Sequence, residues 1–138
     1  MKVKCIKNRG GEVSENVRRV FGLLSDEAMF SAEVGKEYTV LGIVMKKGLL
    51  GYIIYNAPVI SIEPQEIFAV LVSQLSENWF FNGSPSHDLK HQMEIDAVWG
   101  DYELCFKENY LISLMEMDEK SVHHFLSKNS KILKIEDI

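Results

Sequence analysis

The stretch that determines the fold class is Lys36-Glu37-Tyr38-Thr39-Val40-Leu41-Gly42-Ile43-Val44, which is followed shortly by Gly51-Tyr52-Ile53-Ile54-Tyr55. Both segments are rich in β-branched and aromatic residues, which favour β-strands. Between them, Lys46-Lys47-Gly48 is polar and contains the glycine that turns favour. The two segments are therefore predicted to pair as a β-hairpin.

Further short strands are predicted on both sides of this hairpin. Residues 2–6 alternate polar and apolar, residues 59–62 follow the turn Asn56-Ala57-Pro58, and residues 66–72 follow Pro64. Residues 66–72 form either a strand or a short helix, and the proline at their border favours the strand. Residues 12–32 show a mixed pattern without a proper helix cap, which predicts a mobile loop with one helical turn. Short strands separated by frequent turns favour a small barrel or sandwich.

The second half of the chain has a different character. Asn82-Gly83-Ser84-Pro85-Ser86 is the strongest loop signal, and residues 82–98 are predicted to be loop-rich. Residues 99–130 are predicted to be mostly helical, with Asp118 as the N-cap of a helix that carries Val122, Phe125 and Leu126 on one face. Residues 131–135 either add a last strand or stay loose. The expected fold is α+β, with residues 2–81 mostly β in a small SH3-like antiparallel β-barrel or a strongly bent sheet, and helices in the C-terminal part.

Length and composition describe one ordinary globular domain over residues 1–138. Hydrophobic residues make up 46% and charged residues 25% of the chain, both near the averages for such domains. No run of 18 apolar residues is present, and no apolar stretch follows the basic N-terminus. We therefore expect a cytoplasmic protein that does not enter a membrane. Cys5 and Cys105 are expected to be small buried side chains in a reducing compartment.

The charge of the chain is concentrated in one region. The net charge is −5, but residues 61–120 hold twelve acidic residues against three lysines. Within them, the segment from Glu94 to Glu119 has eight acidic residues and only Lys107 to oppose them. This distribution argues against nucleic-acid binding. It predicts either an ordinary solvated face or a surface that attracts a basic protein.

Motifs for catalysis or cofactor binding are absent from the sequence. Neither a G-x-S-x-G motif nor a glycine-rich phosphate-binding motif occurs. Acidic neighbours raise the pKa of a thiol, which argues against a reactive Cys105. His87 and His91 are four residues apart, a spacing that places two metal ligands on one helix face, with Glu94 or Asp96 nearby. We predict no catalytic residue, cofactor or metal, with the His87–His91 pair as the main alternative.

Aromatic residues provide the other candidate site. Trp79-Phe80-Phe81 cannot all point inward from a strand, because successive side chains lie on opposite faces. Either the C-terminal helices cover the outer side of this segment or it anchors a partner, since aromatic residues dominate interface hot spots. The predicted partner-binding residues are five acids for attraction and three aromatic anchors: Glu94, Asp96, Asp101, Glu103, Glu108, Trp79, Trp99 and Tyr102.

The motifs of residues 30–81 resemble those of a loosely defined group of small bacterial proteins. Four motifs carry this resemblance: a G-K-x-Y-x-V strand at residues 35–40, a tyrosine-containing strand at 51–55, a P-x-x-x-F segment at 64–68 and an L-S-x-x-W-x-F segment at 75–81. It implies an SH3-like small barrel, and some similar small acidic proteins are immunity partners of secreted bacterial toxins. It implies no catalytic residues.

The function predicted from the sequence is non-enzymatic protein binding in the cytoplasm. The expected partner is a basic protein, and the resemblance suggests a bacterial toxin domain that this chain neutralises as an immunity protein. The alternative is a small-ligand-binding or regulatory SH3-like barrel domain, in which Tyr38, Tyr52 and Tyr55 line a groove. The sequence predicts no nucleic-acid partner and leaves the oligomeric state open.

Overall fold

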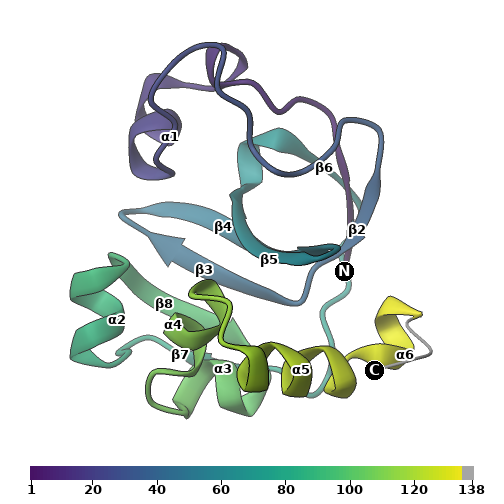
Figure 1. Ribbon diagram of the computed structural model, residues 1–138, viewed down its shortest axis with the longest axis vertical. Coiled ribbons are helices and arrows are strands. Elements are labelled where there is room, and N and C mark those ends of the chain that lie inside the picture. Colours follow the sequence, from purple (N-terminus) through teal and green to yellow (C-terminus); the bar gives the residue numbers. More distant parts are fainter. Residues whose placement is uncertain (135–138) are drawn as a thin grey trace.

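The computed structural model describes residues 1–134, which form two antiparallel sheets and a set of short helices (Figure 1). The predicted α+β class, with antiparallel strands and helices in the C-terminal part, is confirmed. Within the described residues the two sheets do not close into a barrel. The predicted segment 131–135 begins inside a short helix, and its last residue, Ile135, lies outside the described residues.

The first sheet has three strands in the order β2-β1-β6. The central strand β1 (Lys2–Cys5) pairs with β2 (Glu37–Thr39) on one side and β6 (Phe68–Val72) on the other. Its inward-facing residues, Val3 and Cys5, are fully buried. The strand predicted at residues 66–72 is correct from Phe68 onward, and a 3-10 turn, η2 (Gln65–Ile67), precedes it.

The second sheet has five strands in the order β5-β4-β3-β8-β7. The predicted hairpin is confirmed as β3 and β4, and the predicted third strand is β5. Lys47 and Gly48 connect β3 to β4 with φ values of 47° and 80°, the left-handed conformation that favoured two-residue hairpin turns require. The strand bounds are Gly42–Lys46 for β3, Leu49–Asn56 for β4, Val59–Pro64 for β5, Phe80–Asn82 for β7 and Ile95–Gly100 for β8.

The single strand predicted over residues 36–44 is instead divided between the two sheets. The Val40 N–H donates to the Met1 carbonyl (3.0 Å), whereas the next N–H, of Leu41, donates to the Ile53 carbonyl in the second sheet (2.8 Å). Val40 and Leu41 are both buried, in different core clusters. Two successive apolar residues break the alternation of a regular strand, and the chain buries both by passing from one sheet to the other.

The five-stranded sheet is the middle layer of the molecule, with one apolar core on each side (Figure 1). Along β4, Tyr52 and Ile54 face the core shared with the first sheet, while Ile53 faces the core beneath the helices. Phe125 and Leu114 are fully buried in this second core. Strand β4 is therefore buried on both faces, which explains its almost continuous apolar sequence.

Six short helices complete the described part of the fold, and side chains cap four of them. Ser14, Ser86, Asp101 and Asp118 each accept a hydrogen bond from a main-chain N–H in the first turn of the helix that follows. The predicted helix capped by Asp118 is confirmed as α5. The helix bounds are Glu15–Val20 for α1, His87–Gln92 for α2, Tyr102–Phe106 for α3, Tyr110–Met115 for α4, Glu119–Lys128 for α5 and Ser130–Leu133 for α6, with a 3-10 turn η1 at Gly10–Glu12.

Two local predictions are wrong. Residues 82–98 are not loop-rich, because they contain α2 and most of β8. In residues 12–32 the predicted helical turn is present as α1, but the prediction that it has no cap is wrong, because Ser14 accepts a hydrogen bond from the Val17 N–H. No helix in the described part of the chain is long and apolar enough to cross a membrane.

Candidate partner-binding surface

Helix α3 is built so that one side is buried and the other is aromatic and exposed. Asp101 caps it by accepting the Leu104 N–H at 2.9 Å, and Leu104 and Cys105 pack into the core. Tyr102 and Phe106 are four residues apart and therefore lie on one face. The strand next to this helix, β7, contributes Phe80 to the same place.

Phe80, Tyr102 and Phe106 form a continuous group of rings, which we call the aromatic cluster. The ring centroids lie 5.6 Å apart for Phe80 and Tyr102, 6.1 Å for Phe80 and Phe106, and 5.2 Å for Tyr102 and Phe106. Their exposed fractions are 47%, 61% and 47%, in the same order. Large aromatic side chains in contact with each other and with water form an unusual surface for a domain that acts alone.

The opposite face of β7 carries a second aromatic contact. Phe81 points away from Phe80 because successive strand residues alternate, and its ring lies 4.7 Å from that of Trp99 on β8. Phe81 is 54% exposed. Trp99 also lines a shallow apolar groove of about 390 Å³, together with Ile43, Met45, Leu50 and Leu75. The short edge strand β7 therefore has exposed aromatic surface on both faces.

Of the three predicted anchors, Tyr102 is the exposed one. Trp99 is half-buried beneath Phe81. Trp79 is half-buried too and packs against the core shared with the first sheet. Phe80 and Phe106 were not among the predicted anchors. The i, i+4 spacing of Tyr102 and Phe106 would have indicated that these two rings share a helix face.

Two of the five predicted acids, Asp101 and Glu103, bind α5 to α3. The Lys128 Nζ lies 3.0 Å from an Asp101 carboxylate oxygen and 2.8 Å from Glu103 Oε1, and His124 Nε2 lies 2.6 Å from the same Glu103 oxygen. Lys107 adds a longer ion pair to Glu103 at 3.6 Å. Hydrogen bonds from Lys128 and His124 lower the pKa of Glu103 to about 2. These two carboxylates are therefore largely neutralised by lysines within the same molecule.

The other three predicted acids lie elsewhere. Glu94 has a left-handed backbone (φ 59°) and forms an ion pair with Lys47. Asp96 is the extra residue of a β-bulge, since Met45 pairs with Ala97 and Lys46 with Ile95, and its side chain is exposed. Glu108 follows α3 and is exposed. Among the described residues, Asp96 and Glu108 form no ion pair.

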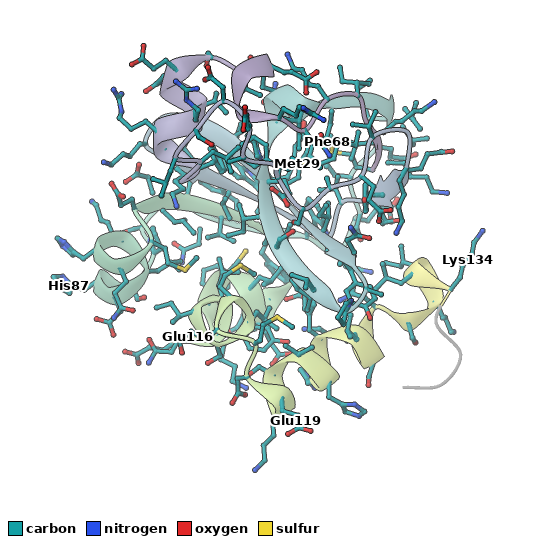
Figure 2. The ribbon with its side chains drawn as sticks, turned by 45° about the horizontal axis from the view of Figure 1, so that its top comes forward. Met29, Phe68, His87, Glu116, Glu119 and Lys134 are labelled. Carbon is teal, nitrogen blue, oxygen red and sulfur yellow. The ribbon has the colours of Figure 1, made fainter. Side chains whose placement is uncertain are left out.

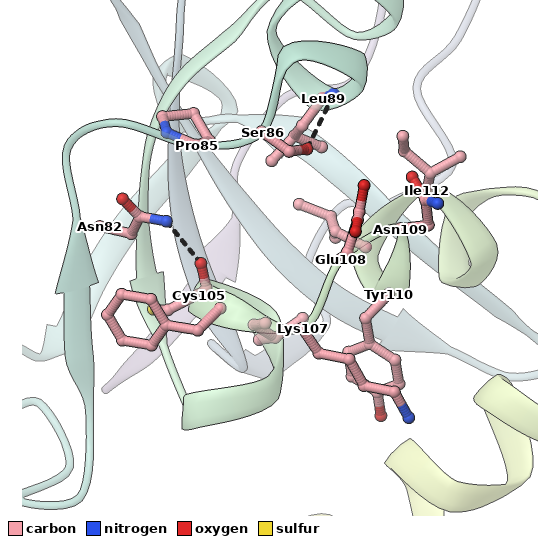
Figure 3. Close-up of a pocket in the computed structure, with 13 residues that line it drawn as sticks. Asn82, Pro85, Ser86, Leu89, Cys105, Lys107, Glu108, Asn109, Tyr110 and Ile112 are labelled. Atoms are coloured by element: carbon pink, nitrogen blue, oxygen red, sulfur yellow. Dashed lines mark hydrogen bonds between the residues drawn. The ribbon is translucent and has the colours of Figure 1, made fainter.

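A pocket of about 230 Å³ lies between β7, α2, α3 and α4, beside the aromatic cluster (Figure 3). The Asn82 side chain closes one end by donating to the Cys105 main-chain oxygen at 2.6 Å, and the Ser86 hydroxyl caps α2 at its roof. Tyr110 is a buried residue of the pocket lining, and the Lys107 Nζ lies 5.3 Å from the centroid of its ring. Burial raises the pKa of Tyr110, and its hydroxyl has no hydrogen-bond partner among the described residues.

The described residues do not assemble a nucleophile or a metal site. Cys5 and Cys105 are both free and buried, as expected, and burial raises the pKa of each thiol. His87 and His91 do share a face of α2, with ring centroids 4.0 Å apart, and His87 lies at the outer edge of the molecule (Figure 2). In residues 1–134 these histidines are not joined by a third histidine, cysteine or carboxylate in a group that could hold a metal ion.

Comparison with protein families, curated proteins and solved structures finds no match for this chain. The aromatic cluster and its surroundings are therefore the observations on which a functional argument rests.

Proposed function

We propose that this chain is a non-enzymatic protein-binding protein and that the aromatic cluster is the centre of its contact surface. The observation that carries the proposal is that Phe80, Tyr102 and Phe106 touch one another while each keeps about half of its surface in water. Tyrosine and phenylalanine are enriched in protein interfaces, and tyrosine is prominent among hot spots. Covering these rings would release water from a large apolar area.

The charge around the cluster supports a basic partner. The two segments that contain the aromatic cluster, residues 73–86 and 94–109, hold six acids and one lysine, although Glu94 and Asp96 lie beside Lys47 and Lys90 rather than beside the rings. Ion pairs with Lys47, Lys107 and Lys128 occupy three of the acids. The remaining acids are Glu77, Asp96 and Glu108, which would speed the approach of a basic protein. A bacterial toxin domain that this chain neutralises as an immunity protein is such a partner, in line with the resemblance of residues 30–81.

We also propose that the β-rich part of the chain is SH3-like. The passage of residues 37–46 from one sheet to the other supports this, because strands that switch sheets form the corners of small barrels. The placement of the tyrosines gives less support to the alternative function, small-ligand binding by a tyrosine-lined groove. Tyr38 and Tyr52 are buried on one side of the second sheet, and Tyr55 packs on the other.

Co-expression tests the proposed function. The genes beside its own are searched for one that encodes a toxin-like C-terminal domain, the chain is produced together with that domain, and growth and complex formation are measured. We expect the wild-type chain to restore growth and the Tyr102→Ala/Phe106→Ala variant to bind at least about tenfold more weakly. Leu24→Ala is the matched control, because Leu24 is 97% exposed and lies in the loop between α1 and β2. Equal binding by all three proteins would refute the role of the cluster.

A second measurement tests the charge of the partner. Asp96→Asn/Glu108→Gln removes two acids that form no ion pair within residues 1–134, so the association rate at low salt should fall and its dependence on salt should flatten. Glu27→Gln removes an exposed acid from the segment between α1 and β2, which Figure 1 shows at the opposite end of the fold from α3, and should change neither. An unchanged rate in the double variant would show that the partner is not recognised by its positive charge.

A further inference from the structure

The open side of strand β7 is the basis of a further inference. This strand stands at the end of the five-stranded sheet and pairs only with β8, with Phe80 opposite Gly100 and Phe81 opposite Trp99. Main-chain groups on its other side have no strand partner in the described part of the chain. An edge strand of this kind is a template on which an extended segment of another protein can add a strand.

The other three sheet edges carry features that oppose strand addition. Strand β5 ends in Pro64 and contains the inward-pointing charge of Glu63, which is buried. Strand β6 has a bulge, since Val3 pairs with Val70 but Lys2 pairs with Val72. The β2 edge begins with an exposed glutamate, Glu37. Charges, prolines and bulges are the usual means by which proteins protect sheet edges.

Strand β7 lacks these features. Residues 78–86 contain no charged side chain, and the proline among them follows the strand. Its length of three residues limits pairing, but aromatic surface extends outward on both of its faces. Figure 1 shows β7 at the margin of the sheet, with α3 beside it. An added strand would place alternate side chains on the aromatic cluster and, on the opposite face, against Phe81 and Trp99.

We propose that the partner binds by adding a strand to β7, and that this strand is apolar at its centre and basic at its ends. The inference rests on the proposed function and specifies the mode of binding. A second copy of this chain is a poorer occupant, because two molecules would each bring Glu77, three residues before β7, and Glu108, which lines the same pocket as Asn82, to one interface. A basic segment would meet these acids with opposite charge. Main-chain hydrogen bonds would fix its direction, and the aromatic rings would cover its apolar side chains.

A synthetic peptide with the sequence Arg-Lys-Val-Tyr-Val-Tyr-Lys-Arg tests this binding mode on the intact chain. Binding is measured by titration, and amide hydrogen exchange is followed in residues 79–84. We expect the peptide to bind and to slow exchange in β7 by at least about tenfold, since strand pairing protects main-chain amides. The same peptide with alternate amides N-methylated keeps its side chains and charge but lacks main-chain donors, so it should not bind.

The outcomes separate the two proposals. Strand addition would be overturned if the peptide binds without slowing exchange in β7 and its N-methylated form binds equally well. If Tyr102→Ala still abolishes this binding, the proposed function remains intact. No binding of either peptide at about 1 mM would also overturn strand addition. Restored growth that is insensitive to Tyr102→Ala/Phe106→Ala would overturn the proposed function itself. Phe81→Ala should weaken the binding of the unmodified peptide, as Tyr102→Ala does, whereas Leu24→Ala should leave that binding unchanged.

Discussion

Replacing Glu103 by glutamine tests whether this acid stabilises the fold rather than attracting a partner. The hydrogen bonds from Lys128 and His124 lower its pKa from 4.5 to about 2. This difference corresponds to about 3 kcal/mol at 1.36 kcal/mol for each pH unit. The side chain keeps 25% of its surface exposed, and ion pairs open to water contribute only about 0.2–1 kcal/mol each. We therefore expect Glu103→Gln to lower the free energy of unfolding by about 1–2 kcal/mol at neutral pH.

The pH dependence of this effect identifies its cause. A carboxyl group whose pKa is lowered by folding contributes all of its stabilisation at pH values above 4.5, its pKa in the unfolded chain. This stabilisation is lost as the pH falls towards the folded-state pKa of about 2. The difference between wild type and Glu103→Gln should therefore be full at pH about 7 and small at pH about 2, as measured by urea unfolding. Glu108→Gln is the matched control and should have no effect on stability. Equal stability of wild type and Glu103→Gln at neutral pH would refute the structural role of Glu103.

Three further predictions concern stability and reactivity. Burial raises the pKa of Glu63, which accepts hydrogen bonds from Ser31. The wild-type protein should therefore lose stability as the pH rises above 4.5, because the buried carboxyl group must then give up its proton. Glu63→Gln should abolish this loss and should be more stable than the wild type at neutral pH, as measured by thermal unfolding. Phe125→Ala empties the centre of the core beneath the helices and should cost about 3–5 kcal/mol in urea unfolding, and a smaller cost would contradict the described packing. Cys105 should react with a thiol reagent only after denaturation, because it is buried and its pKa is raised; rapid reaction of the native protein would show that α3 opens.

Strands and helices with strong local signals were predictable from the sequence. The β3–β4 hairpin combines β-branched residues with a glycine turn, and α5 combines an aspartate cap with an i, i+3, i+4 apolar pattern. Elements that depend on distant contacts were not predictable. Strand β7 has three residues and exists because β8 pairs with it, and the division of residues 36–44 requires two sheets at once. In both cases tertiary contacts outweigh local preference.

The aromatic part of the candidate surface was partly predictable. Tyr102 was identified, and the run Trp79-Phe80-Phe81 indicated that at least one ring would face away from the core. The grouping of Phe80 with Phe106 was not predictable, because it depends on α3 lying beside β7. A sequence pattern gives the face on which a side chain lies, but not the neighbour that meets it across two elements.

The acids show why charge along a sequence overstates charge on a surface. Counted along the chain, the segment from Glu94 to Glu119 has one lysine and eight acids. In the structure, two lysines from outside that segment form ion pairs with three of these acids: Lys47 with Glu94, and Lys128 with Asp101 and Glu103. The field that reaches a partner comes mainly from the acids left over, and a few exposed charges change the rate of association more than the final affinity. If a partner is bound tightly, most of the binding energy must then come from the rings of the aromatic cluster and the open edge of β7. Selection between partners would depend on shape and apolar contact, with charge determining how fast they meet.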